Sequence, residues 1–279
     1  MKIVIIGGTG VFGQFWKRYF EEKGFEVIIS SRSTIIKPQE AVNLGDVIIF
    51  SVSIRNTVKT IRDLLPYIPE NKLIMDFTGI KLKASEEMSK YTLGEVVATH
   101  PMFGPWVKNL ENQNIAFDPI KPGKKWEEIY NLLKQNGANM INMSSKKHDE
   151  LVSIVQSAVH FVNLLLGHIL KKKGIDMGQI LDIGTPISRI QMLILARFLN
   201  QNASLYTDMQ IHNDYYKESI LPEIKNYVDF LEDIINSGDI ESFEKEFNDV
   251  KDHMGKDFLD KALSTTSIID KEVRDFLKD

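Results

Sequence analysis

Hydrophobic positions in the first half of the chain form short, continuous runs that are separated by amphipathic stretches. The runs are rich in β-branched residues and bounded by glycine or polar residues, a pattern typical of buried strands. The predicted strands are 2–6, 26–30, 46–52, 73–77, 96–99 and 139–143. Helical spacing predicts helices at 11–23, 57–65, 84–91 and 126–135. This alternation predicts a mainly parallel sheet with both faces covered.

The pattern changes near residue 145, after which only helical spacing is found. The predicted helices are 148–173, 185–200, 215–236, 240–254 and 268–278. Pro222 either kinks the third of these or marks its true start. We therefore expect two domains, 1–145 and 146–279. Apolar residues occupy nearly every face of the first two helices, so we expect this region to pack against a second copy of the chain.

Composition excludes several classes of protein. The chain has 279 residues, of which 43% are hydrophobic, and its formal net charge is 34 − 38 = −4. That balance gives no general attraction for nucleic acid or anionic membrane. Cysteine is absent, which excludes disulfides, thiolate metal sites and cysteine nucleophiles, and we expect no metal. No uninterrupted apolar run reaches the roughly 18–20 residues of a membrane span, and the N-terminus is unlike a signal peptide, so we expect a cytoplasmic protein without a membrane partner.

A glycine-rich turn joins the first predicted strand to the first predicted helix with the spacing G-x-G-x-x-G. The first glycine allows a tight turn, the second lets backbone approach a pyrophosphate, and the third lets the helix pack on the strand. Free N–H groups at the helix start would bind phosphate. The alternative is a glycine turn with no ligand. We predict an α/β chain, with a Rossmann-like dinucleotide-binding domain at 1–145 and an all-α substrate and dimerisation domain at 146–279. The expected cofactor contacts are Gly8, Thr9, Gly10, Val11, Phe12 and Gly13.

The end of the second predicted strand bears on the choice between NAD and NADP. Folds that select NAD usually carry an acidic residue there, which binds the ribose 2′-hydroxyl. This chain instead has Ser30, Ser31, Arg32 and Ser33, with no carboxylate. Arg32 offers a cationic group for a 2′-phosphate, and the serines offer hydroxyls. We therefore predict NADP in preference to NAD, with Ser31, Arg32 and Ser51 among the cofactor contacts.

One histidine follows a strand of the predicted sheet at the end where ligands bind. His100 comes directly after the strand at 96–99, and ligands of open α/β sheets bind beyond the carboxyl ends of the strands. Pro101 restricts the backbone of His100 to extended conformations, and Pro105 fixes the exit of the chain. A histidine held rigidly beside a hydride acceptor suits the removal of a proton from an alcohol. The alternative is a histidine with a structural role only.

Polar residues with helical spacing interrupt the apolar helices of the second half. Asp149, Ser153, Gln156 and His160 would share one helix face. This stripe is either a hydrogen-bonded helix interface or a wall of the active site with His160 facing ligand, whereas His148 and Asp149 are expected to begin the helix.

Two arginines lie in the strongly apolar helix predicted at 185–200. Arg189 and Arg197 are eight residues apart. A buried guanidinium needs an anionic partner, which is either a protein carboxylate or a substrate carboxylate. Few acidic residues lie nearby in the sequence, which favours a substrate carboxylate.

Taken together, these segments resemble the prephenate dehydrogenase family of tyrosine biosynthesis, especially the dehydrogenase portion of the T-protein and archaeal relatives. The matching segments are GGTGVFG, ATHPMFGP, KKHDELVSIVQSAVHF and TPISRIQMLILARFLNQNASLYTD. The resemblance implies oxidative decarboxylation of prephenate to 4-hydroxyphenylpyruvate, with hydride transfer from ring C4 to the nicotinamide and loss of carbon dioxide. It implies that His100 deprotonates the ring hydroxyl and that Arg197 binds a substrate carboxylate. It further implies that Lys81, His160, Arg189 and Gln201 line the same pocket.

Two positions depart from the family's pattern and keep other substrates open. Gly79 stands where the family often has serine, so a hydroxyl that could orient His100 is missing unless Thr78 replaces it. Ser53 stands where the family tends to have proline. Arogenate or an amino-prephenate analogue remains an alternative substrate, and a non-catalytic NADP-binding regulator remains an alternative function. A β-hydroxyacid reductase is disfavoured by the His100 loop and the arginine pair. With no fused chorismate mutase or regulatory segment in the sequence, we expect a monofunctional dehydrogenase.

Overall fold

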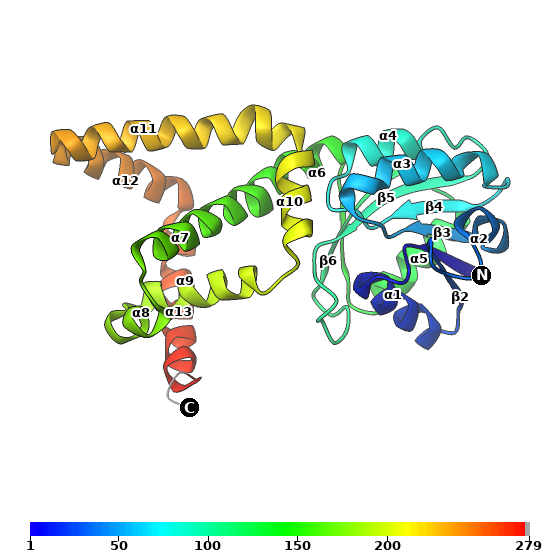
Figure 1. Cartoon of the computed structure of the whole chain (residues 1–279), viewed down its shortest axis with the longest axis horizontal. Coiled ribbons are helices and arrows are strands. Elements are labelled where there is room, and N and C mark those ends of the chain that lie inside the picture. Colours follow the sequence, from blue (N-terminus) through cyan, green and yellow to red (C-terminus); the bar gives the residue numbers. More distant parts are fainter. Residues whose placement is uncertain (277–279) are drawn as a thin grey trace. The chain divides into compact units, whose positions relative to one another are not determined.

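The computed structural model describes residues 1–276, and the chain divides into two compact units. The first unit comprises 1–153 together with 207–215, and the second comprises 154–206 together with the chain from 216 onward. Figure 1 labels most of the elements of both units. The helix predicted at 268–278 extends beyond the described residues at its end.

The first unit is built on a seven-stranded sheet in the order β2-β1-β3-β4-β5-β6-β7. The strands are β1 Lys2–Ile6, β2 Glu26–Ser30, β3 Val47–Phe50, β4 Leu73–Asp76, β5 Glu95–Pro101, β6 Asn114–Lys121 and β7 Asn139–Asn142. Neighbours from β2 to β5 pair in parallel, β6 is antiparallel to β5, and β7 is parallel to β6. The predicted mainly parallel sheet is therefore confirmed. Strand β6 was not predicted, because Pro119 interrupts its pattern and proline is normally confined to edges and irregular positions of a sheet.

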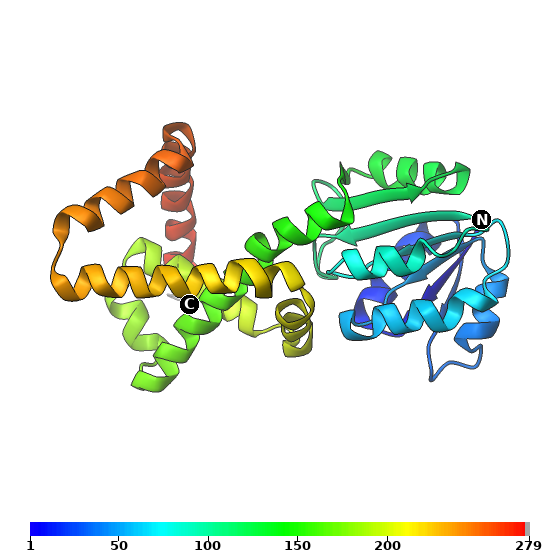
Figure 2. The same cartoon turned by 90° about the horizontal axis from the view of Figure 1, so that it is seen from above.

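Helices cover both faces of this sheet, as the alternation of buried side chains requires (Figure 1, Figure 2). On one face, Ile3 and Ile5 of β1 pack with side chains of α1 (Val11–Glu22) and α5 (Lys124–Gln135). On the other face, Val4 and Ile6 pack with side chains of α2 (Pro38–Leu44), α3 (Ile54–Leu64) and α4 (Leu82–Met88). Successive residues of one strand thus supply two separate cores, which explains why the strands are apolar throughout.

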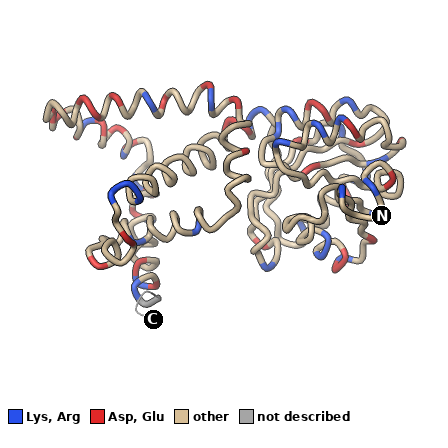
Figure 3. Tube along the Cα trace, viewed as in Figure 1, with Lys and Arg blue, Asp and Glu red and all other residues tan. Residues whose placement is uncertain are grey.

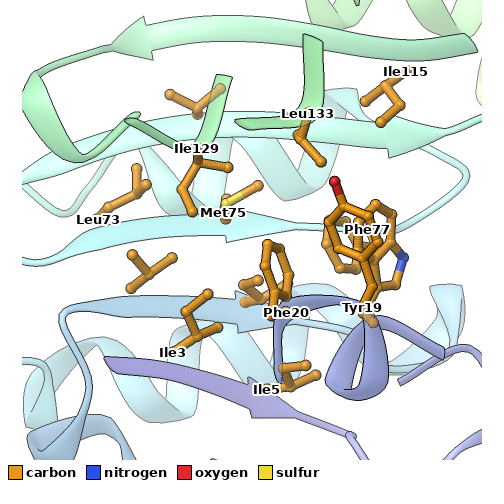
Figure 4. Close-up of a cluster of buried hydrophobic side chains, with 14 of the residues drawn as sticks. Ile3, Ile5, Tyr19, Phe20, Leu73, Met75, Phe77, Ile115, Ile129 and Leu133 are labelled. Atoms are coloured by element: carbon orange, nitrogen blue, oxygen red, sulfur yellow. The ribbon is translucent and has the colours of Figure 1, made fainter. Parts of the chain in front are cut away.

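Aromatic side chains concentrate in the core beneath α1. Trp16 is completely buried, and its ring stacks on Phe77 with centroids 4.7 Å apart. It also meets Tyr19 edge-on, with centroids 5.4 Å apart. Figure 4 shows Tyr19, Phe20 and Phe77 lying over the strands beside the residues that α5 contributes. This cluster joins the helix after the glycine loop to the chain that follows β4, and so fixes two segments at the carboxyl edge of the sheet.

The rest of the described chain is helical. The elements are α6 Ser145–Val152, a π-helical turn Ser153–Ala158, α7 Val159–Lys173, α8 Met177–Ile183, α9 Pro186–Leu199, α10 Ala203–His212, a π-helical turn Tyr216–Ile220, α11 Leu221–Ser237, α12 Ile240–Met254 and α13 Lys256–Phe276. The single helix predicted at 148–173 is thus interrupted by a π-helical turn. Pro222 marks the start of α11, where its missing N–H costs nothing. A Rossmann-like sheet followed by an all-α part confirms the predicted fold class.

One helical run is more apolar than the sequence analysis expected. Ser145–Lys173 is long and apolar enough to cross a membrane by length and composition, and 22% of its most apolar window is buried. The expectation that no segment reaches this threshold is wrong, because it counted only uninterrupted apolar residues. Figure 3 shows few charges along α7 before Lys171–Lys173. A single helix of this kind is weak evidence for a membrane, since core helices of soluble proteins also meet the criterion.

We expect Trp16→Ala to lower the free energy of unfolding by about 3–5 kcal/mol, because it removes a buried ring and leaves a cavity. Trp106→Ala is the matched control: Trp106 is 68% exposed, and its truncation should change stability by less than about 0.5 kcal/mol. Urea denaturation followed by circular dichroism measures both. Equal stability of the two variants would contradict this account of the core.

Candidate active site

The glycine loop has the geometry that a dinucleotide-binding turn requires. The positive φ falls on Gly7 (85°), one residue before the glycine expected to make the tight turn. Gly13 lies so close to the preceding turn that a Cβ there would stand 2.6 Å from Cα of Gly8. The main-chain oxygen of Ser51 borders the same loop, 2.3 Å from where a Cβ of Gly7 would be. The structure thus brings Ser51 beside Gly7, the residue directly before the expected cofactor contacts 8–13.

The turn after β2 is organised by its own hydroxyl groups. Ser31 Oγ and Ser33 Oγ lie 3.0 Å apart, and Thr34 Oγ1 accepts a hydrogen bond from the N–H of Ser31 at 2.9 Å. Lys37 Nζ donates to the main-chain oxygen of Arg32 at 3.0 Å. Arg32 itself is exposed. The turn therefore presents hydroxyls and cations, without a carboxylate among residues 30–37.

His100 is the first member of a buried hydrogen-bonded chain. It lies in β5, is 7% exposed, and its Nδ1 is 2.8 Å from Nε2 of His148 in α6. His148 Nδ1 is in turn 2.8 Å from Oδ1 of Asp149. His100 thus lies within β5 and not after its end, as was predicted, and the structure places it against a second histidine and, beyond that, a carboxylate. The expectation that His148 and Asp149 begin the helix is wrong, because α6 begins at Ser145, and both side chains are buried.

Asp149 is held by the main chain where α4 begins. Its Oδ1 accepts the N–H of Lys81 at 2.8 Å, and its Oδ2 accepts the N–H of Leu82 at 2.9 Å. The N-cap residue of α4, Lys81, makes no side-chain capping bond of its own in the described chain. Asp149 therefore caps α4 from α6, and its carboxylate lies at the end of the helix dipole that favours a negative charge.

Lys81 points into the protein. It is 2% exposed, and its Nζ forms an ion pair with Asp76 at the end of β4 and donates to the main-chain oxygen of Thr99 at 2.7 Å. Asp76 also accepts the N–H groups of Thr78 and Thr99, each at 3.1 Å. This network ties the ends of β4 and β5 together. Burial lowers the pKa of Lys81, and the negative charge of Asp76 opposes that effect.

The charge state of the two histidines follows from burial. Burial first, and then the nearby His148 and Lys81, hold the pKa of His100 well below its ordinary value. Burial also lowers the pKa of His148, although the hydrogen bond to Asp149 partly offsets it. Both rings are therefore neutral near pH 7. Asp149 can only accept, so His148 carries its proton on Nδ1 and accepts on Nε2 from Nδ1–H of His100. This leaves Nε2 of His100 unprotonated and able to take a proton.

Gly79 lies next to that nitrogen. A Cβ at Gly79 would stand 3.7 Å from Nε2 of His100 and 3.4 Å from Cδ1 of Ile54, both ordinary contact distances. The position can therefore accept a small side chain, and glycine is not required by crowding. Thr78, the residue considered as a replacement hydroxyl, is buried, and its Oγ1 lies 3.4 Å from Oγ1 of Thr57.

The second unit holds the remaining predicted residues, with His160 in an aromatic setting. Its ring stacks on Phe198 with centroids 5.3 Å apart and meets Tyr206 edge-on at 4.4 Å. Burial lowers the pKa of His160 to about 4. Its Nδ1 is buried without a hydrogen-bond partner in the described part of the chain, as is Oε1 of Gln156. The polar stripe is divided: Asp149 and Ser153 belong to the first unit, Gln156 and His160 to the second.

The two arginines of α9 have different surroundings. Arg189 forms an ion pair with Asp270 of α13 at 2.8 Å and donates to the main-chain oxygen of Gly184. Its anionic partner is therefore a protein carboxylate, which sequence proximity could not reveal. Arg197 is exposed and forms no ion pair within residues 1–276. Gln201 follows one turn later, and its N–H donates to the main-chain oxygen of Phe198 at 3.3 Å.

Family models match most of the chain. The model described as prephenate dehydrogenase, nucleotide-binding domain, matches residues 26–142. The model described as prephenate dehydrogenase, dimerization domain, matches residues 144–249.

Individual curated proteins that resemble this chain carry names of the same family. A probable arogenate/prephenate dehydrogenase of Methanocaldococcus jannaschii is 34% identical over 97% of this chain and 66% of its own length. The T-protein of Haemophilus influenzae is 28% identical over 91% of this chain and 67% of its own length. The chain thus spans about two thirds of these curated relatives.

Solved structures share the fold. Prephenate dehydrogenase from A. aeolicus, in complex with hydroxyphenyl propionate and NAD+, has a TM-score of 0.70 at 17% identity, covering 90% of this chain and 96% of that one. Arogenate dehydrogenase from Synechocystis has a TM-score of 0.65 at 17% identity, covering 91% and 98%.

We expect the free energy of unfolding to fall as the pH drops below about 6.5, the ordinary pKa of histidine. His100, His148 and His160 have lowered pKa values in the folded chain, so the unfolded chain binds more protons in that range. Each contributes at most about 1.4 kcal/mol per pH unit. Denaturation curves between pH 4.5 and 8 measure the slope, which His100→Gln should reduce. His168→Gln, at an exposed position, is the control, and an unchanged slope in His100→Gln would contradict the burial argument.

Proposed function

Because the chain belongs to the prephenate dehydrogenase family, we propose that it catalyses the NADP-dependent oxidative decarboxylation of prephenate to 4-hydroxyphenylpyruvate. The observation that carries this proposal is the hydrogen-bonded chain from His100 through His148 to Asp149. It provides a neutral, buried histidine with one free ring nitrogen, which is what a base for a ring hydroxyl requires. Arogenate is the second substrate to test, since the relative from M. jannaschii is named for both.

The glycine loop supports a dinucleotide cofactor. Gly10 is the N-cap of α1 and has no side chain to occupy the free N–H groups of the helix start. The close packing of Gly13 on Gly8 leaves the backbone open to a pyrophosphate. In this proposal residues 8–13 and Ser51 hold the dinucleotide, and Ser31 and Arg32 hold the ribose 2′-phosphate. When bound, the nicotinamide supplies the hydride acceptor.

The acid–base step falls to His100. Its Nε2 accepts the proton of the hydroxyl group on ring C4 as hydride leaves C4. The bond to the ring carboxylate then breaks and carbon dioxide leaves. The electrons of that bond make the ring aromatic and end on the oxygen at C4, which takes the proton back from His100. The charge that develops on His100 is stabilised through Nδ1–H by His148, which Asp149 orients. Burial, and after it the nearby His148 and Lys81, lower the pKa of His100 and keep it unprotonated before the reaction.

The substrate's carboxylates need cationic partners. Arg197 is exposed and without an ion pair in the described chain, so its guanidinium is available for bidentate binding. Arg189 has Asp270 as its partner and Lys81 has Asp76, so we assign them supporting roles. We also place His160, a neutral polar group, and Gln201, one turn beyond Arg197, among the residues that line the substrate pocket.

We further propose that the chain forms a homodimer through its second unit. The match of residues 144–249 to a dimerization domain supports this proposal. So do exposed apolar side chains on α7 and α9, such as Val162 (53% exposed), Leu164 (57%) and Ile187 (81%). A subunit interface also accounts for the apolar character of Ser145–Lys173 without a membrane.

We expect His100→Asn to lower kcat by about 10²–10⁴-fold with prephenate, because the base is lost while substrate contacts remain. Arg197→Ala should instead raise KM, since it removes a carboxylate contact already present in the ground state. Nicotinamide absorbance with prephenate or arogenate measures both. Turnover of His100→Asn at the wild-type rate would overturn the assignment, and NADP binding without turnover of either acid would favour a regulator.

We expect Arg32→Ala to raise the KM for NADP by about tenfold or more, because a charge-assisted contact to the 2′-phosphate is lost, and to leave the KM for NAD unchanged. Lys23→Ala removes an exposed cation at the far end of α1 and serves as the control. A wild-type enzyme that prefers NAD by tenfold would contradict the cofactor assignment.

A further inference from the structure

A short stretch of the chain leaves the second unit, joins the first, and returns. Residues 207–215 pack with the sheet unit, whereas the chain on both sides of them belongs to the helical unit. We call Thr207–Tyr215 the crossing segment. It contains the last turn and a half of α10 and the residues that follow it. Its first two residues, Thr207 and Asp208, end the last segment that resembles the family, but no role was predicted for any of its residues and the proposed mechanism does not use it.

The crossing segment first contacts the start of α3. Asp208 is 2% exposed, and its carboxylate accepts Nε–H of Arg55 at 2.6 Å and the main-chain N–H of Arg55 at 3.2 Å. Arg55 is the second residue of α3, and the N-cap residue Ser53 makes no side-chain cap in the described chain. Asp208 therefore supplies the negative charge that the start of α3 lacks.

A second contact reaches the surroundings of His100. Met209 packs in a buried cluster with Ile54, Ile80 and Val152. Ile54 and His100 both border Gly79, since a Cβ added at that glycine would stand 3.4 Å from Cδ1 of Ile54 and 3.7 Å from Nε2 of His100. Because interiors are closely packed, a shift of Met209 would be transmitted to the residues beside the base.

A third contact holds the residue at the other end of the hydrogen-bonded chain. Asn213 is completely buried, and its Nδ2 donates to the main-chain oxygen of Asp149 at 3.0 Å. Asp149 orients His148, so Asn213 fixes the main chain that carries this carboxylate. A further charged contact of the segment, Asp214 with Lys83, lies at the surface, where the two side chains are 39% and 60% exposed.

We propose that the crossing segment positions the chain of His100, His148 and Asp149, with Asp208 and Asn213 as positioning residues. Anchoring alone would need only apolar burial, whereas a buried carboxylate and a buried amide are costly unless they are hydrogen-bonded, and such bonds fix the groups that they join. Those bonds end on α3, beside Ile54, and on α6, which carries His148. This inference rests on the proposed function only in taking His100 as the base.

The test compares Asp208→Asn and Asn213→Ala with Asp214→Asn, which makes the same acid-to-amide change in the same segment at an exposed ion pair. We expect the first two to lower kcat for prephenate by on the order of 10- to 100-fold, because small misplacements of a reacting group have effects of that size. They should also shift the ring ¹⁵N signals of His100, recorded without substrate. Asp214→Asn should match the wild type in both measurements.

Unchanged kcat and an unchanged His100 spectrum in folded Asp208→Asn and Asn213→Ala would overturn the proposal. Lower melting temperatures with wild-type kcat would do the same, since they indicate anchoring only. If Asp208→Asn does not fold, Arg55→Lys removes the Nε–H donor from the half-exposed side of the contact and must shift the spectrum likewise. Because the spectrum needs no turnover, it decides the question even if prephenate is not the substrate.

Discussion

The arrangement around His100 depends on one buried carboxylate, that of Asp149. It accepts two main-chain N–H groups where α4 begins and the ring N–H of His148 from α6. The same group therefore caps the N-terminus of α4 and sets the tautomers of His100 and His148. A buried carboxylate is tolerated only when its oxygens have donors, and here each oxygen has one from the main chain. The start of α4 and the orientation of His148 therefore both depend on the position of the Asp149 carboxylate.

A second buried charge pair acts on the same histidine from the sheet side. The resemblance places Lys81 in the substrate pocket, whereas the structure directs its ammonium to Asp76 and to the main chain of Thr99. Removing one member of such a pair leaves an uncompensated charge, which is far more costly than losing both. Lys81 thus affects His100 through its field and through the alignment of β4 and β5, and direct contact with a ligand is not needed for either effect.

Patterns with short range were readable in the sequence, and contacts between distant residues were not. Strand and helix alternation and the fold class are confirmed, because each depends on local periodicity. The pairing of Arg189 with Asp270 spans 81 residues, and that of His100 with His148 spans 48, so neither leaves a local signal. The adjacent pair His148 and Asp149, ahead of an apolar helix, was the one available hint. The predicted cofactor and substrate residues remain predictions, because the positions of side chains do not by themselves identify the ligand that they contact.

The first unit depends on the crossing segment, which lies beyond residues 154–206 of the second unit in the sequence. A fragment ending near 150 would keep the sheet and the glycine loop but would lose Asp208 and Asn213, which hold α3 and the main chain of Asp149. Grafting the helical part of a relative onto this sheet would import foreign versions of those two residues. Recombination between family members at the boundary in sequence would therefore change the groups that hold α3 and the main chain of Asp149, even though every residue of the sheet itself was kept.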